Sequence, residues 1–229
     1  MSQNLLKRLF TSIVLILLII FINFSHQYIF ILSILLVGLI ICFEANSIFS
    51  KFEDPQFEKK NSSIKKFNFK FLILNLLTFF YIFLIFCNFS YEIHRYESPT
   101  FFLYVISICF FTDIGGYVIG KIIGGKKLSK ISPNKTISGT IGSFIFSLIP
   151  LILFLNFSDL DLEFNLNFII FSLLISLISQ IGDLFISFLK RKAKVKDTGK
   201  LLPGHGGILD RLDGIIFAIP VSYFLLKLF

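Results

Sequence analysis

The densest group of polar residues in this chain lies in residues 187–213, within a sequence that is otherwise rich in apolar side chains. This segment reads SFLKRKAKVKDTGKLLPGHGGILDRLD and combines Lys and Arg with three Asp, one His and a glycine-rich turn. Asp210 and Asp213 are three residues apart, a spacing that places both carboxylates on one face of a helix. Hard oxygen ligands of this kind suit Mg²⁺, which typically binds one or two carboxylates together with substrate phosphates.

Cations in the same segment could neutralise such phosphates. They are Lys190, Arg191, Lys196 and Arg211. Arg can hold a phosphate with two parallel hydrogen bonds, and the glycines of the run from Pro203 to Gly207 let the backbone approach a ligand closely. Carboxylates, cations and a glycine-rich turn together predict phosphoryl or nucleotidyl transfer. A polybasic loop that binds anionic lipid is the alternative, but it leaves the Asp residues and the turn unexplained.

Three further carboxylates lie inside apolar stretches: Glu44, Asp113 and Asp183. Each is expected about 9–12 Å in from the basic end of its helix. A charge at such depth costs about 2.5 kcal/mol or more unless it is paired, hydrated or bound to a cation. Their similar depth predicts one polar cavity. The alternative, a hydrogen bond to a neighbouring helix, is strongest for Glu44, and for Asp113 the sequence leaves metal, nucleotide and neighbouring backbone open.

A second phosphate site is indicated immediately before the apolar run that starts at Ile137. The stretch Ser132-Pro133-Asn134-Lys135-Thr136 combines a turn, a cation and two hydroxyls. The free N–H groups of a helix N-terminus bind phosphate readily. Ser132 and Lys135 are therefore candidate phosphate-binding residues.

Glycines follow Asp113 along the chain, and packing explains them at least as well as ligand binding does. The spacing of Gly116 and Gly120 favours close contact between two helices. Gly124-Gly125 is expected to end the helix, because the phosphate-loop pattern G-x-x-x-x-G-K-[ST] is absent from the sequence.

The elements that must position these groups are membrane helices. The 229 residues are 55% hydrophobic and 17% aromatic, so we expect an all-α, polytopic transmembrane bundle that forms a single domain over residues 1–229. A spanning helix needs about 20 apolar residues. Runs near that length are Leu9–Phe24, Tyr28–Phe49, Phe69–Phe89, Phe101–Gly120, Ile137–Phe157, Asn167–Leu189 and Gly214–Phe229. The last run is short, so the count stays open between seven spans and nine helices.

The basic residues predict the orientation of this bundle. With the N-terminus in the cytoplasm, all but two of the 22 Lys and Arg residues fall on one side, the exceptions being Arg95 and Lys227. Cytoplasmic loops are enriched in Lys and Arg, so residues 187–213 are expected at the cytoplasmic face. The net charge of +8 is distributed between apolar runs, which excludes a nucleic-acid partner and favours lipid headgroups or a nucleotide.

These polar blocks resemble the signature of the phosphatidate cytidylyltransferases, also called CDP-diacylglycerol synthases. The matching positions in residues 187–213 are Ser187, Lys190-Arg191, Lys196-Asp197, Gly199, Leu202-Pro203, His205-Gly206-Gly207, Asp210-Arg211 and Asp213. Upstream blocks are Asp113-Ile114-Gly115, Ser132–Thr136 with Ser138-Gly139, and Gln180–Leu184, while Phe43-Glu44-Ala45 is a weaker likeness to an early Trp-Glu segment. Many members of this family are longer and have more spans.

The resemblance implies that CTP and phosphatidic acid give CDP-diacylglycerol and pyrophosphate in phospholipid biosynthesis. It implies that Asp183 and Asp210 ligate Mg²⁺, in a site with room for a second, monovalent cation such as K⁺. The expected location is the inner (plasma) membrane of a bacterial cell, with a multi-pass chain in the lipid bilayer and an active site open to the cytoplasm. Whether the chain forms a homodimer is left open.

In this mechanism the phosphate of phosphatidic acid attacks the α-phosphorus of CTP in line, and pyrophosphate leaves. The nucleophile is already anionic, so the main task is to hold two polyanions together and to stabilise developing charge. We assign Asp183 and Asp210 to Mg²⁺, with Asp213 as a third ligand or as a partner of the ligands. His205 either donates to a leaving phosphate oxygen or braces the turn. The phosphate-binding cations would be Lys135, Lys190, Arg191, Lys196 and Arg211.

Other classes make different demands on the sequence. An acid cluster inside a membrane can mark an ion-coupled transporter, but inverted hydropathy halves are not visible. The CDP-alcohol phosphotransferases need Asp-Gly-x-x-Ala-Arg, and the residues after Asp213-Gly214 do not fit it. A CTP-dependent lipid kinase is the nearest chemical neighbour, and it would release CDP instead of pyrophosphate.

Substitution of one acidic residue should separate chemistry from folding. Asp210→Asn is expected to abolish CTP-dependent lipid product while the protein stays membrane-inserted, because a carboxylate charge is lost without a change in side-chain size. Lys200→Ala, outside the signature, should retain near-normal activity. Near-normal turnover of Asp210→Asn at saturating Mg²⁺ would refute the assignment of Asp210.

Overall fold

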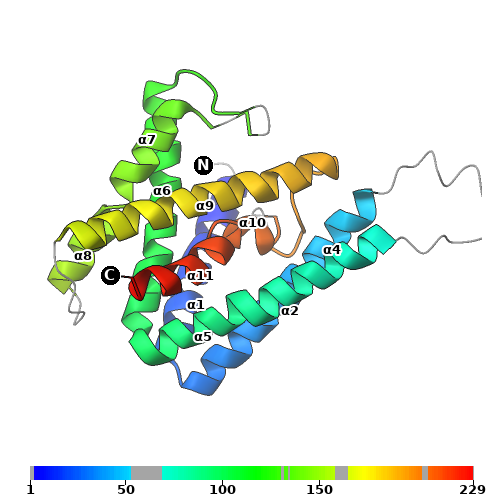
Figure 1. Ribbon diagram of the computed structural model, residues 1–229. Coiled ribbons are helices and arrows are strands. Elements are labelled where there is room, and N and C mark those ends of the chain that lie inside the picture. The colour runs from blue at the N-terminus through cyan, green and yellow to red at the C-terminus, as the bar shows by residue number, and fades with distance from the viewer. Residues whose placement is uncertain are drawn as a thin grey trace, which may run out of the picture.

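The computed structural model describes residues 3–52, 69–129, 132–133, 135–157, 165–202 and 206–228. In these ranges it is built from helices and contains no β-strand, only two isolated bridges (Figure 1). The helices are α1 (Gln3–Phe24), α2 (Gln27–Phe49), α4 (Phe69–Phe80), α5 (Asn88–Glu92), α6 (Pro99–Ile123), α7 (Ile137–Phe146), α8 (Ile149–Phe157), α9 (Leu166–Lys192), α10 (Leu209–Leu212) and α11 (Ile215–Leu226). The prediction of an all-α fold is confirmed.

All seven apolar runs predicted from the sequence lie on helices. By length and composition, the helices able to cross a membrane are Gln27–Phe52, Phe69–Glu97, Pro99–Ile123, Ile137–Asn156 and Leu166–Lys192. In α1, the apolar part that is described covers Thr11–Phe24. The last helix, α11, is shorter than its predicted run and would reach only about 18 Å. Half of its residues are buried, so this helix contributes to the interior of the bundle.

Two helix boundaries differ from the predicted runs. The run that starts at Phe69 continues to Glu97, because α4 passes into α5 and beyond it through two wider, π-helical segments, η2 (Tyr81–Cys87) and η3 (Ile93–Glu97). The run that starts at Ile137 is interrupted between α7 and α8. There the Ser147 hydroxyl donates to the Phe144 carbonyl oxygen at 2.7 Å.

Local sequence signals set the ends of the two longest helices. Ser98 caps α6 by accepting a hydrogen bond from the Phe101 N–H at 2.8 Å, with Pro99 in the first turn. Asn165 caps α9 in the same way through the Phe168 N–H at 3.0 Å. Gly124 ends α6 with a φ of 65°, a left-handed conformation that favours glycine. The expectation that Gly124-Gly125 ends a helix is confirmed.

Glycines allow α6 and α7 to pack backbone against backbone. A Cβ at Gly115 would lie 2.5 Å from the Gly142 carbonyl oxygen, and a Cβ at Gly120 would meet Thr136 and Gly139. The Ser143 hydroxyl donates across the same interface to the Thr112 carbonyl oxygen at 2.8 Å. The packing explanation for the glycines after Asp113 is therefore confirmed, with α7 as the partner helix.

Hydroxyl groups link α6 to α9 in the middle of the bundle. Tyr104 and Ser172 share a hydrogen bond of 2.8 Å, and the Thr112 hydroxyl donates to the Ser176 hydroxyl at 2.9 Å. Both contacts are buried, where an unpaired hydroxyl would be costly. They fix α9 against α6, and thereby the position of the half of α9 that carries Asp183. The predicted topology directs this half toward the cytoplasm.

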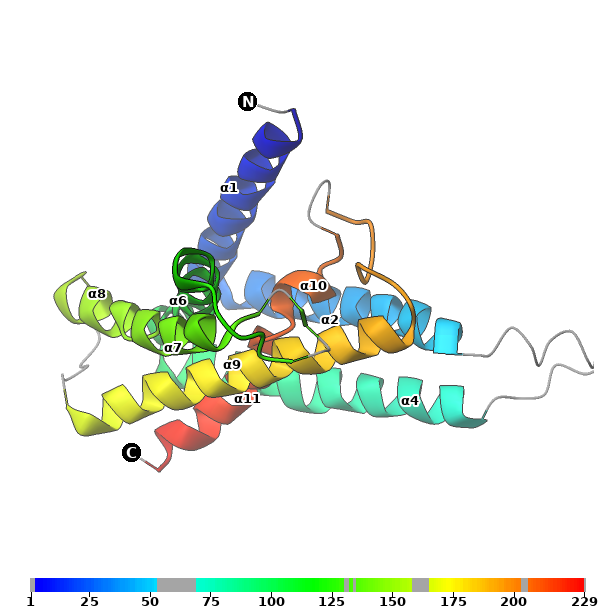
Figure 2. The ribbon, with the colours of Figure 1, turned by 90° about the horizontal axis from the view of Figure 1, so that it is seen from above.

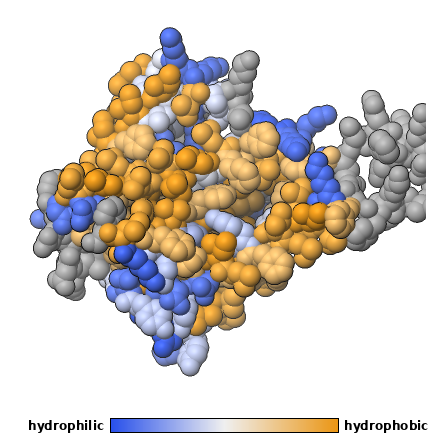
Figure 3. All heavy atoms as spheres, in the orientation of Figure 1, coloured by the Kyte–Doolittle hydropathy of each residue, from blue (hydrophilic) through white to orange (hydrophobic). Residues whose placement is uncertain are grey.

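The helices form two arms with α9 between them. Figure 1 shows α6 and α7 as one arm, α2 and α4 as the other, and α10 and α11 beside α9. Seen from above, α1 projects away from the rest (Figure 2), and many of its apolar side chains are exposed, including Phe21 at 69%. Large apolar areas cover the face of the molecule that Figure 3 shows, as is expected of helices that face lipid.

The glycine contact between α6 and α7 should be intolerant of larger side chains. Gly142→Val is expected to destabilise the protein by about 3 kcal/mol, because its Cβ would overlap Ile119. Thermal unfolding in detergent can be followed by the reactivity of the buried thiols Cys87 and Cys109. Ile141→Phe is the control, since Ile141 is 57% exposed on the same helix. An unchanged melting temperature for Gly142→Val would contradict the close packing.

Candidate active site

One face of α9 carries an acid, a hydroxyl and a base at helical spacing. Asp183, Ser187 and Lys190 are separated by four and three residues, which places them in line along one side of the helix. The Ser187 hydroxyl donates to Asp183 Oδ1 at 3.2 Å. Basic side chains at Lys190–Lys192 occupy the last turn, where they interact favourably with the negative end of the helix dipole.

Asp210, in α10, is held by donors from three places. Lys190 Nζ donates to its Oδ1 at 2.8 Å, in an ion pair that is largely buried. The N–H groups of Thr198 and Gly207 donate to its Oδ2 at 2.7 and 3.0 Å. Burial opposes ionisation of this carboxyl, but these hydrogen bonds outweigh it and hold the pKa of Asp210 below its ordinary value.

Glu44, from α2, is buried in the same region and accepts three hydrogen bonds. The donors are the Ile208 N–H at 3.0 Å, the Leu209 N–H at 2.9 Å and the Thr198 hydroxyl at 2.8 Å. Of the two explanations offered by the sequence for Glu44, the structure supports the hydrogen-bonded carboxylate. Its three partners belong to the polar segment 187–213, and each is more than 150 residues away from Glu44 in sequence.

Asp213 lies where α9 and the start of α11 come closest. A Cβ at Gly182 would meet the Asp213 carbonyl oxygen at 2.7 Å, so the backbones touch and the Asp213 side chain lies near Asp183. Burial raises the pKa of Asp213 to about 8, and the negative charges of Asp183 and Asp113 add to this shift. Three carboxylates from α6, α9 and the α10–α11 junction therefore lie within electrostatic range of one another.

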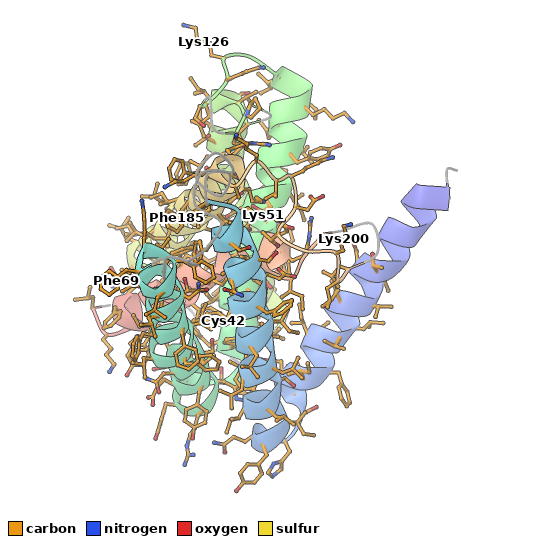
Figure 4. The ribbon with its side chains drawn as sticks, turned by 90° about the vertical axis from the view of Figure 1, so that its right-hand side faces the viewer. Cys42, Lys51, Phe69, Lys126, Phe185 and Lys200 are labelled. Carbon is orange, nitrogen blue, oxygen red and sulfur yellow. The ribbon has the colours of Figure 1, made fainter. Side chains whose placement is uncertain are left out.

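Lys135 brings a positive charge to this carboxylate group from the loop after α6. The Leu128 N–H donates to the Lys135 carbonyl oxygen at 2.8 Å, and the Ile137 N–H donates to the Lys126 carbonyl oxygen at 3.0 Å. These bonds fold the loop back on itself. Lys126, which pairs with the first residue of α7, lies at one end of the molecule (Figure 4). The ammonium group of Lys135 then forms an ion pair with Asp183 Oδ2.

The other residues proposed from the sequence are placed less specifically. The carbonyl oxygen of Ser132 accepts a hydrogen bond from the Lys135 N–H at 3.1 Å, so Ser132 shapes the turn. Arg191, Lys196 and Arg211 are exposed, and Arg211 lies within electrostatic range of Asp113. His205 lies outside the described residues, so both roles considered for it remain predictions.

Thr198 is a site residue that was not predicted from the sequence. Its hydroxyl lies 2.8 Å from Glu44 Oε2 and 3.0 Å from Asp210 Oδ2, and it thus joins two carboxylates from distant parts of the chain. The available signal was weak: a hydroxyl between Asp197 and Gly199 in a polar loop. Its partner Glu44 could not be identified from sequence spacing.

The donor set is compatible with Mg²⁺, although not as a ready-made cage. In the part of the chain that the structure describes, no three Asp, Glu, His or Cys side chains converge closely enough to ligate one ion. Asp183 and Asp213 are nevertheless neighbours with like charge, and a cation between them would relieve their repulsion. Mg²⁺ commonly uses one or two carboxylates and completes its shell with water and phosphate oxygens. These residues fit that mode of binding.

Comparison with known proteins gives matches over most of the chain. The cytidylyltransferase family model matches residues 55–229. The chain is 42% identical to the phosphatidate cytidylyltransferase of Bacillus subtilis strain 168 over 131 residues, which cover 57% of this chain and 48% of the relative. It is 46% identical to the enzyme of that name from Staphylococcus aureus strain COL over 136 residues, covering 58% and 51%. The chain spans about half the length of the curated relatives it matches.

The shifted pKa of Asp213 gives the metal-free protein a pH-dependent stability. The pKa of this carboxyl is 3.8 in its ordinary state and about 8 in the folded protein. Between these two pH values the folded state binds more protons than the unfolded state, so the free energy of unfolding should fall as the pH rises. Melting temperatures in EDTA, measured from pH 5 to 8.5, should therefore decline. Asp213→Asn should flatten the decline. A wild-type melting temperature that rises from pH 5 to 8.5 would contradict the raised pKa of Asp213.

Proposed function

Because the chain belongs to the cytidylyltransferase family, we propose that it transfers a cytidylyl group from CTP to phosphatidic acid and releases pyrophosphate. The resemblance noted in residues 187–213 is confirmed at the level of the family. The product would be CDP-diacylglycerol, an activated lipid for phospholipid biosynthesis. The names of the bacterial relatives support this choice of substrates.

The observation that carries the proposal is the pairing of lysines with carboxylates from separate segments. Lys190 of α9 pairs with Asp210 of α10, and Lys135 of the α6–α7 loop pairs with Asp183 of α9. Asp213 lies within electrostatic range of both Asp183 and Lys190. Cations for phosphate and carboxylates for a metal thus occupy one neighbourhood, which is the set that nucleotidyl transfer requires.

The two lysines have a direct part in this mechanism. In the substrate-free protein their ammonium groups neutralise Asp183 and Asp210. When CTP and phosphatidic acid bind, Lys135 and Lys190 would turn part of this charge to phosphate oxygens, and the exposed Arg191, Lys196 and Arg211 would add to it. Such contacts orient the lipid phosphate for in-line attack and stabilise charge that develops on the departing pyrophosphate.

We assign Asp183 and Asp210 as the residues that would hold Mg²⁺, with Asp213 as a partner beside Asp183. Because no three such side chains converge among the described residues, water and phosphate oxygens would complete the coordination shell. When bound, Mg²⁺ would neutralise phosphate oxygens and lower the barrier to charge transfer onto the leaving group. Asp210 is oriented for this task by the Thr198 and Gly207 N–H groups. A bound monovalent cation such as K⁺ stays a prediction of the family resemblance. Asp113 lies within electrostatic range of Asp183 and Asp213, which supports a role for Asp113 in the electrostatics of the same site.

The proposed location is the plasma membrane of a bacterium, with the site open to the cytoplasm. Five helices are long and apolar enough to cross a membrane, and the relatives are bacterial. Lys51, Lys126 and Lys190–Lys192 follow or end helices α2, α6 and α9, in keeping with the enrichment of basic residues on the cytoplasmic side. CTP would reach the site from the cytoplasm and phosphatidic acid from the bilayer.

The direct test is an assay of purified protein in detergent with labelled CTP, phosphatidic acid and Mg²⁺. A cytidine-bearing lipid and stoichiometric pyrophosphate are expected, and excess EDTA should abolish both. Lys200→Ala is the active control, and Asp210→Asn is the inactive one. Release of CDP with a phosphorylated lipid would instead identify a CTP-dependent lipid kinase, and consumption of neither substrate would reject the proposed activity.

A further inference from the structure

Glu44 of α2 is joined by three hydrogen bonds to the polar segment 187–213, which we call the catalytic segment. It is only 5% exposed, and both of its oxygens accept. Oε1 accepts from the Ile208 N–H, while Oε2 accepts from the Leu209 N–H and the Thr198 hydroxyl. Glu44 also precedes residues 55–229, the range matched by the family model.

Two glycines in the catalytic segment make room for this carboxylate. A Cβ at Gly199 would lie 2.5 Å from Glu44 Oε1, and a Cβ at Gly207 would overlap both Glu44 Oε2 and the Thr198 hydroxyl. Neither glycine has a backbone conformation that requires glycine. The absence of side chains at these positions is therefore explained by the close approach of Glu44.

The contacts continue from Glu44 to the lysine of α9 without a break. The Thr198 hydroxyl touches Glu44 and Asp210, the Thr198 N–H donates to Asp210 Oδ2, and Asp210 Oδ1 accepts from Lys190. Asp210 Oδ2 also accepts from the Gly207 N–H, next to the residues that Glu44 holds. Displacement of Glu44 would thus release both backbone regions that donate to Asp210, the one at Thr198 and the one at Gly207.

We propose that Glu44 is a positioning residue for the transfer reaction: it fixes residues 198–199 against residues 207–209 and thereby sets the orientation of Asp210. This inference rests on the proposed function for its catalytic consequence, but its structural part can be measured separately. Glu44 itself acts through Thr198 and the backbone of the catalytic segment. A carboxylate is needed because both oxygens must accept hydrogen bonds at once.

Glu44→Gln tests this requirement with almost no change in volume. In either amide orientation one of the two positions becomes an NH₂ group that faces a backbone N–H, so at least one of the three hydrogen bonds is lost. A small displacement of a catalytic group can cost about 100-fold in rate, so we expect kcat to fall about 10- to 100-fold. The Mg²⁺ concentration for half-maximal rate should rise several-fold. Asn46→Ala, at an exposed position on the same helix, is the matched control and should behave as wild type.

Backbone amide hydrogen exchange on the full chain in detergent provides a readout independent of turnover. In Glu44→Gln, the amides of Thr198 and of Gly207–Leu209 should exchange at least about tenfold faster, while those of α6 and α9 keep wild-type protection. A loss of activity with wild-type exchange in this segment would overturn the positioning role, and so would wild-type kcat and Mg²⁺ dependence in Glu44→Gln. General loss of protection would show that Glu44 serves the stability of the whole bundle, which also contradicts the proposal.

A pair of Thr198 variants tests the same link while leaving Glu44 in place. Thr198→Val removes the hydroxyl at constant shape, and Thr198→Ser retains it. We expect Thr198→Val to reproduce the direction of the Glu44→Gln effects and Thr198→Ser to stay close to wild type. Equal activity and equal exchange in the two variants would overturn the proposed link. If wild-type protein makes no cytidine-bearing lipid, the proposed function fails, whereas the exchange comparison still decides whether Glu44 holds the segment.

Discussion

A carboxylate buried among apolar helices persists only when other parts of the chain supply it with cations or hydrogen-bond donors. Glu44 of α2 and Asp210 of α10 are two such carboxylates. The loop after α9 places the Thr198 hydroxyl between them, within hydrogen-bond distance of both. Lys190 balances the charge of Asp210. The helix arrangement around the site follows from this constraint, because each acid is satisfied only when the segments lie together.

Close approach of backbones is the second condition, and glycine provides it where α9 meets the start of α11. Cβ atoms at Gly182 and Gly214 would overlap the facing helix, through Asp213 and Ser179 respectively. The contact places Asp213 beside Asp183 and creates a group of like charges that burial makes costly to ionise. The ammonium group of Lys135, which pairs with Asp183, offsets part of this negative charge.

Particular residues show how far the sequence could lead. The helical runs, the helix end at Gly124 and the α6–α7 glycine packing follow from hydrophobic run length and backbone sterics, which are local properties. Asp183 and Asp210 could be proposed as metal ligands because hard ligands, cations and glycines recur at the spacing of a known signature. Glu44 was ambiguous, since a buried acid can have many partners, and Thr198 was overlooked because a single hydroxyl in a polar loop has no distinctive pattern.

The sequence by itself determined a helical chain with membrane-length apolar helices and its membership of the cytidylyltransferase family, and it indicated which polar segments to propose as the site. Run length, residue type and motif spacing are sufficient for these conclusions. Only the tertiary structure decided that Glu44 accepts hydrogen bonds from Thr198, Ile208 and Leu209, that Lys135 pairs with Asp183 and that Lys190 pairs with Asp210. These partners lie far apart along the chain, and their contacts depend on how the helices cross, which is set by packing over the whole bundle.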